Sequence, residues 1–130
     1  MLAAMSSAAN PVEAWREMNA LHAAVQTALD REMRAQHGLS AVEYEVLDRL
    51  TSCDSQKCRI QELSDFLQLG QSTASRVVAR LEEEGLAKRA MCTDDRRGIF
   101  ATATEQGREK AVTAGATYRA VLEAKLSPSA

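Results

Sequence analysis

The sequence predicts a mainly helical protein with one small β-hairpin, and three observations support this fold class. Only 6 of the 130 residues are Gly and 2 are Pro, which favours helices because these two residues are the least compatible with a helix interior. Apolar residues recur every three or four positions along most of the chain, as they do on one face of a helix. Between residues 86 and 103, two short apolar runs instead flank a polar loop that ends in Gly98, and this pattern predicts a hairpin.

Length and charge limit the classes of protein to which the chain can belong. A chain of 130 residues fits one domain. With 26% charged residues and a net charge of −2, it is too apolar to be disordered and too acidic to bind nucleic acid through bulk charge, although a single basic face is compatible with these values. No apolar run approaches the roughly 20 residues that span a bilayer, and residues 1–9 lack the pattern of a secretory signal. We therefore expect a cytoplasmic protein that does not enter membranes, with a flexible N-terminus over residues 1–9.

The first predicted helix is long and begins at an N-cap. Asn10 precedes Pro11, which suits the first helical position because its missing N–H needs no partner there. Gly38 ends the helix. Its apolar stripe consists of Trp15, Met18, Leu21, Val25, Leu29 and Met33. A long amphipathic helix of this kind usually buries its stripe against another chain or another terminal helix.

The middle of the chain predicts three further helices and a short strand. Ser40 and Glu43 form a capping-box pattern, in which each side chain accepts a hydrogen bond from an otherwise unpaired backbone N–H. The helix that follows carries the apolar residues Tyr44, Leu47 and Leu50. The remaining elements are a polar turn at 51–57, a strand at 58–60, a helix at 62–67, a turn at 68–70, and a helix at 71–84 that ends at Gly85.

The last third of the chain predicts the hairpin and a final helix. Strands over 86–91 and 99–103 flank the polar loop, and Thr104 begins a helix that runs to Leu126. A short helix, a turn containing Gly and a second helix form a helix-turn-helix, and a hairpin directly after it makes this motif winged. The predicted fold class is therefore mainly α with a small β-hairpin wing, a winged helix-turn-helix flanked by long N- and C-terminal helices.

The first half of the second helix in this motif carries side chains that can bind DNA. This helix contains no acidic residue before Glu82. Its Ser, Thr, Gln and Arg side chains can hydrogen-bond to base edges or phosphates. The candidate DNA-binding residues on it are Gln71, Ser72, Thr73, Ser75, Arg76 and Arg80. An ordinary solvated helix face is the alternative. The crowding of Glu82, Glu83 and Glu84 at the far end favours DNA binding, because it leaves the N-terminal half free of negative charge.

The loop of the hairpin provides a second set of candidates: Asp95, Arg96 and Arg97. The two arginines stand beside Gly98, and an arginine at the tip of a wing gains from the negative potential of a narrow minor groove. Asp94 and Asp95 can orient the guanidinium groups rather than cancel their charge. The alternative is an exposed ion pair of little energetic value.

At these residues the sequence resembles the MarR (multiple-antibiotic-resistance regulator) family of winged-helix transcription factors, over roughly Leu21 to Leu126. The stretches that carry the resemblance are His37-Gly-Leu-Ser40 with Tyr44 and Leu47, Ser72-Thr-Ala-Ser75-Arg76, Leu81-Glu-Glu-Glu-Gly85-Leu86, and Asp95-Arg-Arg97-Gly-Ile-Phe-Ala-Thr-Ala-Thr104-Glu-Gln-Gly107. Each stretch is weak alone, but their order and spacing together are specific.

The resemblance implies a homodimeric repressor that binds double-stranded DNA at a near-palindromic operator. Helices at 10–38 and 104–126 would form the dimerisation region, and residues 39–103 the DNA-binding domain. A small, often aromatic or phenolic, anionic ligand between the two regions would release the DNA. The implied contacts in the major groove are Ser72, Thr73, Ser75 and Arg76. Arg97 would enter the minor groove, oriented by Asp95.

Three features depart from the family pattern. Ala103 stands where Leu is usual, which removes an apolar anchor beneath the wing. Gly70 stands where a capping Ser is common, and Gly is an acceptable N-cap. The sequence stops at Ala130, where relatives often add another helix to the dimer, so we expect a smaller dimer interface.

Cysteine chemistry suggests an alternative, a redox-sensing regulator. Cys53, Cys58 and Cys92 are odd in number and form no CxxC pair, which argues against a disulfide framework and a four-cysteine zinc site. Cys92, next to the wing, is best placed to couple oxidation to DNA release. Unreactive thiols are the simpler interpretation. His22 and His37 have no partners at metal-ligand spacing, so we expect no bound metal.

The sequence does not suggest an enzyme. It has no Gly-rich phosphate loop, nucleophile elbow, HExxH motif or evident catalytic triad, so we expect neither catalysis nor a cofactor. Two alternatives to DNA binding stay open: a winged helix that has lost DNA binding and binds protein partners, and a protein that stores a ligand. In the first case Arg76, Arg80 and Arg97 would be replaceable without loss of function.

Overall fold

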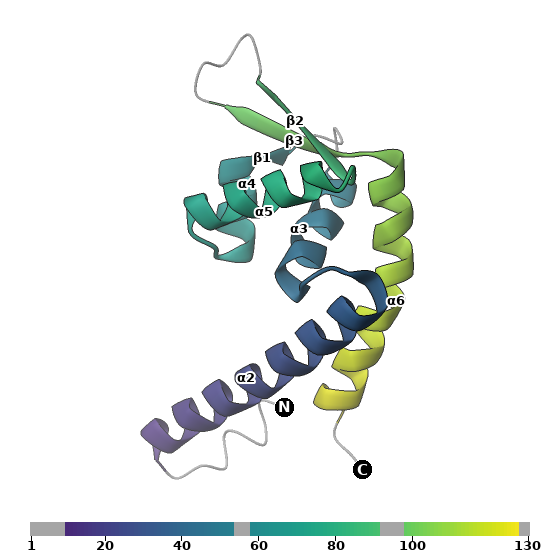
Figure 1. The fold of residues 1–130 in the computed structure, drawn as a ribbon. Coiled ribbons are helices and arrows are strands. Elements are labelled where there is room, and N and C mark those ends of the chain that lie inside the picture. Colours follow the sequence, from purple (N-terminus) through teal and green to yellow (C-terminus); the bar gives the residue numbers. More distant parts are fainter. Residues whose placement is uncertain (1–9, 54–57, 92–97, 128–130) are drawn as a thin grey trace.

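The computed structural model describes residues 10–53, 58–91 and 98–127, which form a mainly helical protein with a three-stranded sheet (Figure 1). In chain order the elements are α2 (Pro11–His37), α3 (Ala41–Ser52), β1 (Cys58–Arg59), α4 (Ile60–Leu67), α5 (Gln71–Glu83), β2 (Ala87–Met91), β3 (Ile99–Ala103) and α6 (Glu105–Leu126). The predicted fold class is confirmed, and each predicted helix and strand is present. Of the helices within these ranges, none is long and apolar enough to cross a membrane.

The elements form two parts, which we name the lobe and the stem. The lobe contains α3, α4, α5 and the sheet, and the stem consists of α2 and α6, which pack against each other (Figure 1). In Figure 1 the β2–β3 hairpin extends from the top of the lobe, α2 lies at the opposite end of the molecule, and α6 runs from beside the sheet down to α2. α6 also packs along α3, so it joins the stem to the lobe.

Local capping determines where the long helices begin and end. The Asn10 side chain accepts a hydrogen bond from the Val12 N–H, at 2.8 Å. Gly38 ends α2 in the left-handed conformation, with φ of 71°, which Gly adopts without steric cost. Ser40 and Glu43 form the predicted capping box, in which each side chain accepts a hydrogen bond from the other residue's N–H. These predicted boundaries are confirmed.

The stem buries only part of the apolar stripe on α2. Val25, Leu29 and Met33 are buried, whereas Trp15 and Met18 are 61% and 43% exposed. The partly buried residues that pack around Val25 and Leu29 are Leu21 of α2 and Tyr118, Val121 and Leu122 of α6, whereas Met33 belongs to the core of the lobe. The N-terminal half of α2 therefore presents apolar side chains that nothing within this chain covers, among the described residues.

The three strands pair antiparallel in the order β1-β3-β2. β1 lies beside β3, with Cys58 opposite Ala101. The sequence predicted strand 58–60 and a helix from residue 62, but α4 begins at Ile60. The reason is burial: Ile60 is 5% exposed and belongs to the core of the lobe, so the chain turns into the helix as soon as the two-residue strand has paired.

α3 lies at the centre of the lobe and contacts every other helix and β3. The most deeply buried side chains around it are Leu47 and Leu50 from α3, Leu63 from α4, and Val78 and Leu81 from α5. Because α4 and α5 bury their apolar faces in this core, their polar faces point outward.

The start of α6 is hydrogen-bonded to the turn that follows α5. The Thr104 hydroxyl donates a hydrogen bond to the Gly85 carbonyl at 2.7 Å and accepts one from the Gly107 N–H at 3.0 Å. A Cβ added at Gly107 would collide with the backbone carbonyl of Leu86, so only Gly allows this approach. The wing and the stem are thus connected through a closely packed joint.

Cys53 and Cys58 form a disulfide that ties the end of α3 to β1. The expectation of no disulfide is wrong for this pair, because an odd cysteine count does not prevent two neighbouring cysteines from bonding. Their Cα atoms are 6.1 Å apart, within the range that a disulfide spans. Cys92, the residue proposed as a redox sensor from the sequence, lies outside the described residues.

Candidate nucleic-acid interface

The core holds α5 so that the predicted DNA-binding residues face outward. Ala74, Val78 and Leu81 are each 0% exposed and anchor one face of the helix. On the opposite face, Gln71, Ser72 and Arg76 are exposed, and Thr73 and Ser75 are partly exposed. The structure therefore brings these five candidates together on one outward surface of α5.

The N-terminus of α5 carries no negative charge. Gly70 is its N-cap and makes no side-chain cap hydrogen bond, and the first turn contains no acidic residue. Backbone N–H groups at such a helix start favour a phosphate group. The replacement of a capping Ser by Gly at residue 70 thus leaves an electropositive end beside the polar side chains of the helix.

A polar hollow lies between α4, α5 and the base of the wing. Two of its lining residues, Arg59 and Gln61, were not predicted from the sequence. Its volume is about 300 Å³, and its lining residues are Arg59, Ile60, Gln61, Gln71, Ser75, Gly98 and Ile99. Arg59 lies over the Phe100 ring, 5.3 Å from its centroid. The first helix of a helix-turn-helix crosses the DNA backbone, and this position at the start of α4 is the signal that would have drawn attention to Arg59 and Gln61.

Arg80, the sixth candidate on α5, lies among acids. Its Nε is 3.4 Å from a Glu84 carboxylate oxygen and 3.7 Å from one of Glu43. The Glu82 carboxylate, at the same end of the helix, accepts a hydrogen bond from Arg89 Nε at 3.0 Å. The acidic end of α5 is therefore partly neutralised by these arginines. Arg80 lines a surface hollow together with Thr73 and Arg76, so it borders the polar surface of residues 71–76 while its guanidinium group is paired with acids.

The wing carries its predicted strands, β2 and β3, in the predicted antiparallel pairing. Asp95, Arg96 and Arg97 lie outside the described residues, so their contact with DNA stays a prediction. Gly98 lines the polar hollow together with Ser75. The base of the wing therefore faces the same hollow as α5.

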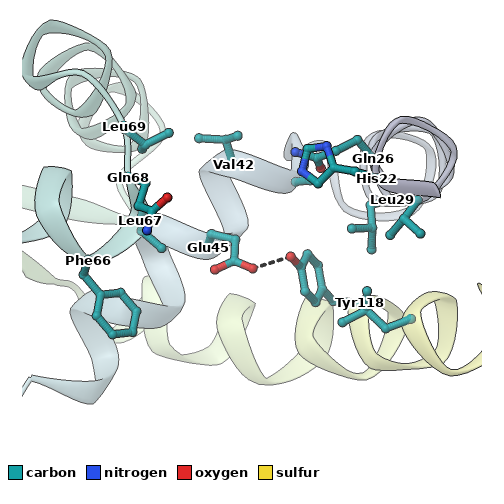
Figure 2. Close-up of a pocket in the computed structure, with 13 residues that line it drawn as sticks. His22, Gln26, Leu29, Val42, Glu45, Phe66, Leu67, Gln68, Leu69 and Tyr118 are labelled. Atoms are coloured by element: carbon teal, nitrogen blue, oxygen red, sulfur yellow. Dashed lines mark hydrogen bonds between the residues drawn. The ribbon is translucent and has the colours of Figure 1, made fainter. Parts of the chain in front are cut away.

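A second feature, which the residue pattern did not reveal, is a cavity of about 470 Å³ between the stem and the lobe (Figure 2). Its lining residues are His22, Val25, Gln26, Leu29, Ala41, Val42, Glu45, Phe66, Leu67, Gln68, Leu69, Tyr118 and Leu122. They come from α2, α3, α4, α6 and the turn before α5. Trp15, at the exposed end of the apolar stripe on α2, is not among them.

Glu45 and Tyr118 are two of the polar residues that line this cavity, and Tyr44 packs against Tyr118. The Tyr118 hydroxyl donates a hydrogen bond to Glu45, and the Tyr118 and Tyr44 rings lie 4.5 Å apart. Burial raises the pKa of Tyr118 well above its usual range, and the hydrogen bond to Glu45 raises it further. The pKa of Tyr44 is also raised, first by burial and then by the charge of Asp48.

Known proteins with the same fold bind DNA. The MarR family model matches residues 39–99. A MarR family transcriptional regulator from Streptomyces coelicolor, solved in complex with DNA, is 28% identical; the match covers 85% of this chain and 69% of that one, with a TM-score of 0.80. AbsC, another MarR family transcriptional regulator from S. coelicolor, is 27% identical over 86% of this chain and 75% of its own, with a TM-score of 0.78.

A more distant structure shares the fold alone. A MarR mutant from E. coli in complex with operator DNA is 16% identical over 85% of this chain and 77% of its own, with a TM-score of 0.73. No curated protein sequence matches the chain. The family model matches most of the lobe, and the solved MarR family regulators share the winged-helix fold, so the lobe of this chain is similar to the DNA-binding domain of MarR family transcriptional regulators.

Proposed function

We propose that this chain is a homodimeric repressor that binds a near-palindromic operator and is released from it by a small ligand. The observation that carries the proposal is the outward surface of α5: five polar or basic side chains on residues 71–76, beside an uncapped helix start and free of acids. A surface of this kind fits the major groove, where Arg, Gln, Ser and Thr can read base edges. The regulators of the same fold whose structures contain DNA support this function.

Individual residues have separate roles in this proposal. Ser72, Thr73, Ser75 and Arg76, with Gln71, contact the major groove, while Arg97 enters the minor groove, oriented by Asp95 and assisted by Arg96. Arg59 and Gln61, at the start of α4, contact the DNA backbone. Arg80 contributes least, because two carboxylates already surround its guanidinium group.

The dimer is proposed to form through the stem, from residues 10–38 and 104–126, with residues 39–103 as the DNA-binding domain. The support is the uncovered apolar surface at the end of α2, where Val12 is 51% and Trp15 61% exposed. Leu126, at the end of α6, is 38% exposed. Burying these side chains against a second copy would be favourable by about 25 cal/mol for each Å² of apolar surface.

Release by a ligand is proposed to act through the cavity between the stem and the lobe. In a symmetric dimer the distance between the two α5 helices depends on the angle between stem and lobe, so a molecule bound between them would change the fit to two successive major grooves. Such a regulator acts in the compartment that holds the chromosome, which we expect to be the cytoplasm, and it performs no catalysis.

Fluorescence anisotropy on labelled DNA tests the proposal. The protein is titrated onto the duplex that lies upstream of its own coding sequence, and onto a scrambled duplex of the same composition, each at two salt concentrations. We expect tighter binding to the upstream duplex and a steep fall in affinity with salt, because phosphate contacts release counterions. Equal and weak binding to both duplexes by an intact dimer would overturn the proposal and favour the protein-interaction alternative.

A further inference from the structure

The cavity between the stem and the lobe has an acidic lining, which restricts the charge of a ligand that can bind in it. Its only ionisable lining groups are His22, Glu45 and Tyr118, and neither Lys nor Arg lines it, among the described residues. His22 is exposed on α2. The remaining lining is apolar apart from Gln26 and Gln68. A ligand that enters the cavity therefore meets one carboxylate and no fixed positive charge.

Glu45 has free capacity to bind such a ligand. Its Oε1 accepts the hydrogen bond from Tyr118, whereas its Oε2 has no hydrogen-bond or ion-pair partner within the part of the chain that the structure describes. Figure 2 shows Glu45 and Tyr118 pointing toward each other, with Phe66 to Leu69 on one side and His22 to Leu29 on the other. A carboxylate accepts several hydrogen bonds when ionised, so Glu45 can serve Tyr118 and a ligand together.

The surroundings reinforce the negative potential. Every group that acts on Tyr118 raises its pKa, and these include the charges of Glu45 and Asp48. Arg119 is a cation on α6 whose charge lowers the pKa of Tyr44. Arg119 does not line the cavity. An anion would therefore be repelled by Glu45, with neither Lys nor Arg in the lining to compensate this charge.

We propose that this cavity binds a small amphipathic cation, an arylalkylamine in chemical class, whose ammonium group donates a hydrogen bond to Glu45 while its apolar part packs against Val42, Leu67 and Leu69. A charge-assisted hydrogen bond in a partly buried site is strong, and the cavity is large enough for a ligand of this size. The ligand class differs from the anionic ligand that the family resemblance implies. Its effect on DNA rests on the proposed function, but its binding does not.

Isothermal titration calorimetry at neutral pH, without DNA, tests the ligand class. Three compounds of matched shape are compared: 2-phenylethylamine, 2-phenylethanol and 3-phenylpropionate, which are a cation, a neutral molecule and an anion. We expect the amine to bind at least about tenfold more tightly than the other two. Equal or tighter binding of the carboxylate, or no binding by any compound because the cavity is closed or covered by a second copy, would overturn the proposal.

Three variants locate the site. Glu45→Gln should weaken the amine by about tenfold or more and abolish its preference, while the amide oxygen still accepts the Tyr118 hydrogen bond. Glu109→Gln makes the same charge change on an exposed residue of α6 outside the cavity and should leave binding unchanged. Val42→Phe should weaken all three compounds, because the larger side chain fills the cavity. Unchanged amine binding in Glu45→Gln would refute the assigned site.

The same protein preparation is then titrated onto the operator duplex with and without the amine. A protein that prefers the amine but does not distinguish the two duplexes would refute the proposed function and retain the ligand class. A protein that distinguishes its operator from the scrambled duplex but shows no preference for the amine would refute the ligand class and retain the proposed function. The two proposals therefore fail separately.

Discussion

The Tyr118 hydroxyl in the stem donates a hydrogen bond to the Glu45 carboxylate in the lobe, across 73 positions of sequence. The Tyr118 ring also packs on Tyr44, tilted by 31°. Because Tyr118 lies where α6 contacts both α2 and α3, this pair links the two parts whose relative angle sets the spacing of the α5 helices in a dimer. A ligand that bonds to Glu45 acts directly on this link.

Tyr118→Phe is expected to reduce the loss of stability at alkaline pH. The pKa of Tyr118 is raised in the folded protein, so above about pH 10 an unfolded tyrosine releases its proton while Tyr118 keeps it. The unfolding free energy therefore falls as pH rises, by about 1.4 kcal/mol per pH unit for each such tyrosine. Urea unfolding at a series of alkaline pH values measures the slope.

The variant should retain part of this slope, because the pKa of Tyr44 is raised as well. At neutral pH, Tyr118→Phe should also lower the unfolding free energy by about 1.5 kcal/mol, the lower end for a hydrogen bond to a charged group. Thr113→Ala, an exposed change on the same helix, is the control and should have little effect. Identical alkaline slopes for the wild type and Tyr118→Phe would contradict the prediction.

Arg76→Ala and Arg80→Ala separate the two arginines of α5. Arg76 is exposed on the polar surface, so its loss should weaken operator binding by about 1–3 kcal/mol and relax sequence preference. Arg80 lies between Glu43 and Glu84, so its loss should have a much smaller effect on binding. Anisotropy on operator duplexes with single base changes measures both. A larger loss with Arg80→Ala would reverse the assignment.

Arg97→Ala should weaken binding to all duplexes and reduce its dependence on salt. A contact that depends on groove potential and phosphate charge carries little base preference, and its removal lowers the slope of log affinity against log salt by about one. Arg16→Ala, an exposed arginine on α2, serves as the control with an unchanged slope. A specificity change without a slope change would argue that Arg97 reads bases instead.

Trp15→Glu is expected to dissociate the dimer. Trp15 is 61% exposed at the end of α2, and a charge there would be buried unpaired in a dimer interface. Sedimentation velocity should show a shift from dimer to monomer, together with weaker operator binding. Ile99→Glu places the same charge on an apolar residue of β3 that is 42% exposed and lies outside the stem, so it should leave the dimer intact. A Trp15→Glu protein that remains dimeric would place the interface elsewhere.

Reduction of the Cys53–Cys58 disulfide is expected to lower the unfolding free energy by about 2 kcal/mol, because closing a short loop restricts the unfolded chain. Cys58→Ser should reproduce the loss, and Cys92→Ser should not, since the disulfide does not involve Cys92. Urea unfolding with and without a thiol reductant measures the difference. A stability that does not respond to reductant would show that the pair contributes nothing in solution.

Much of the fold follows from the sequence, because the deciding interactions are local. The N-cap at Asn10, the capping box of Ser40 and Glu43, and the cap at Thr104 each join residues no more than three positions apart. Such signals are readable without knowledge of the rest of the chain. The same holds for the outward face of α5, since the spacing of Ala74, Val78 and Leu81 determines which side chains remain exposed.

The tertiary structure alone decided the features that join distant segments. The partners of Arg80, the pairing of β1 with β3, and the cavity around Glu45 and Tyr118 all depend on where whole elements pack. Side-chain type and spacing carry no information about a contact across 73 residues, because that contact is set by the burial of α3, α2 and α6 against one another. The sequence by itself thus determined the elements and the outward-facing residues of α5, and packing decided which charges meet and where the cavity lies.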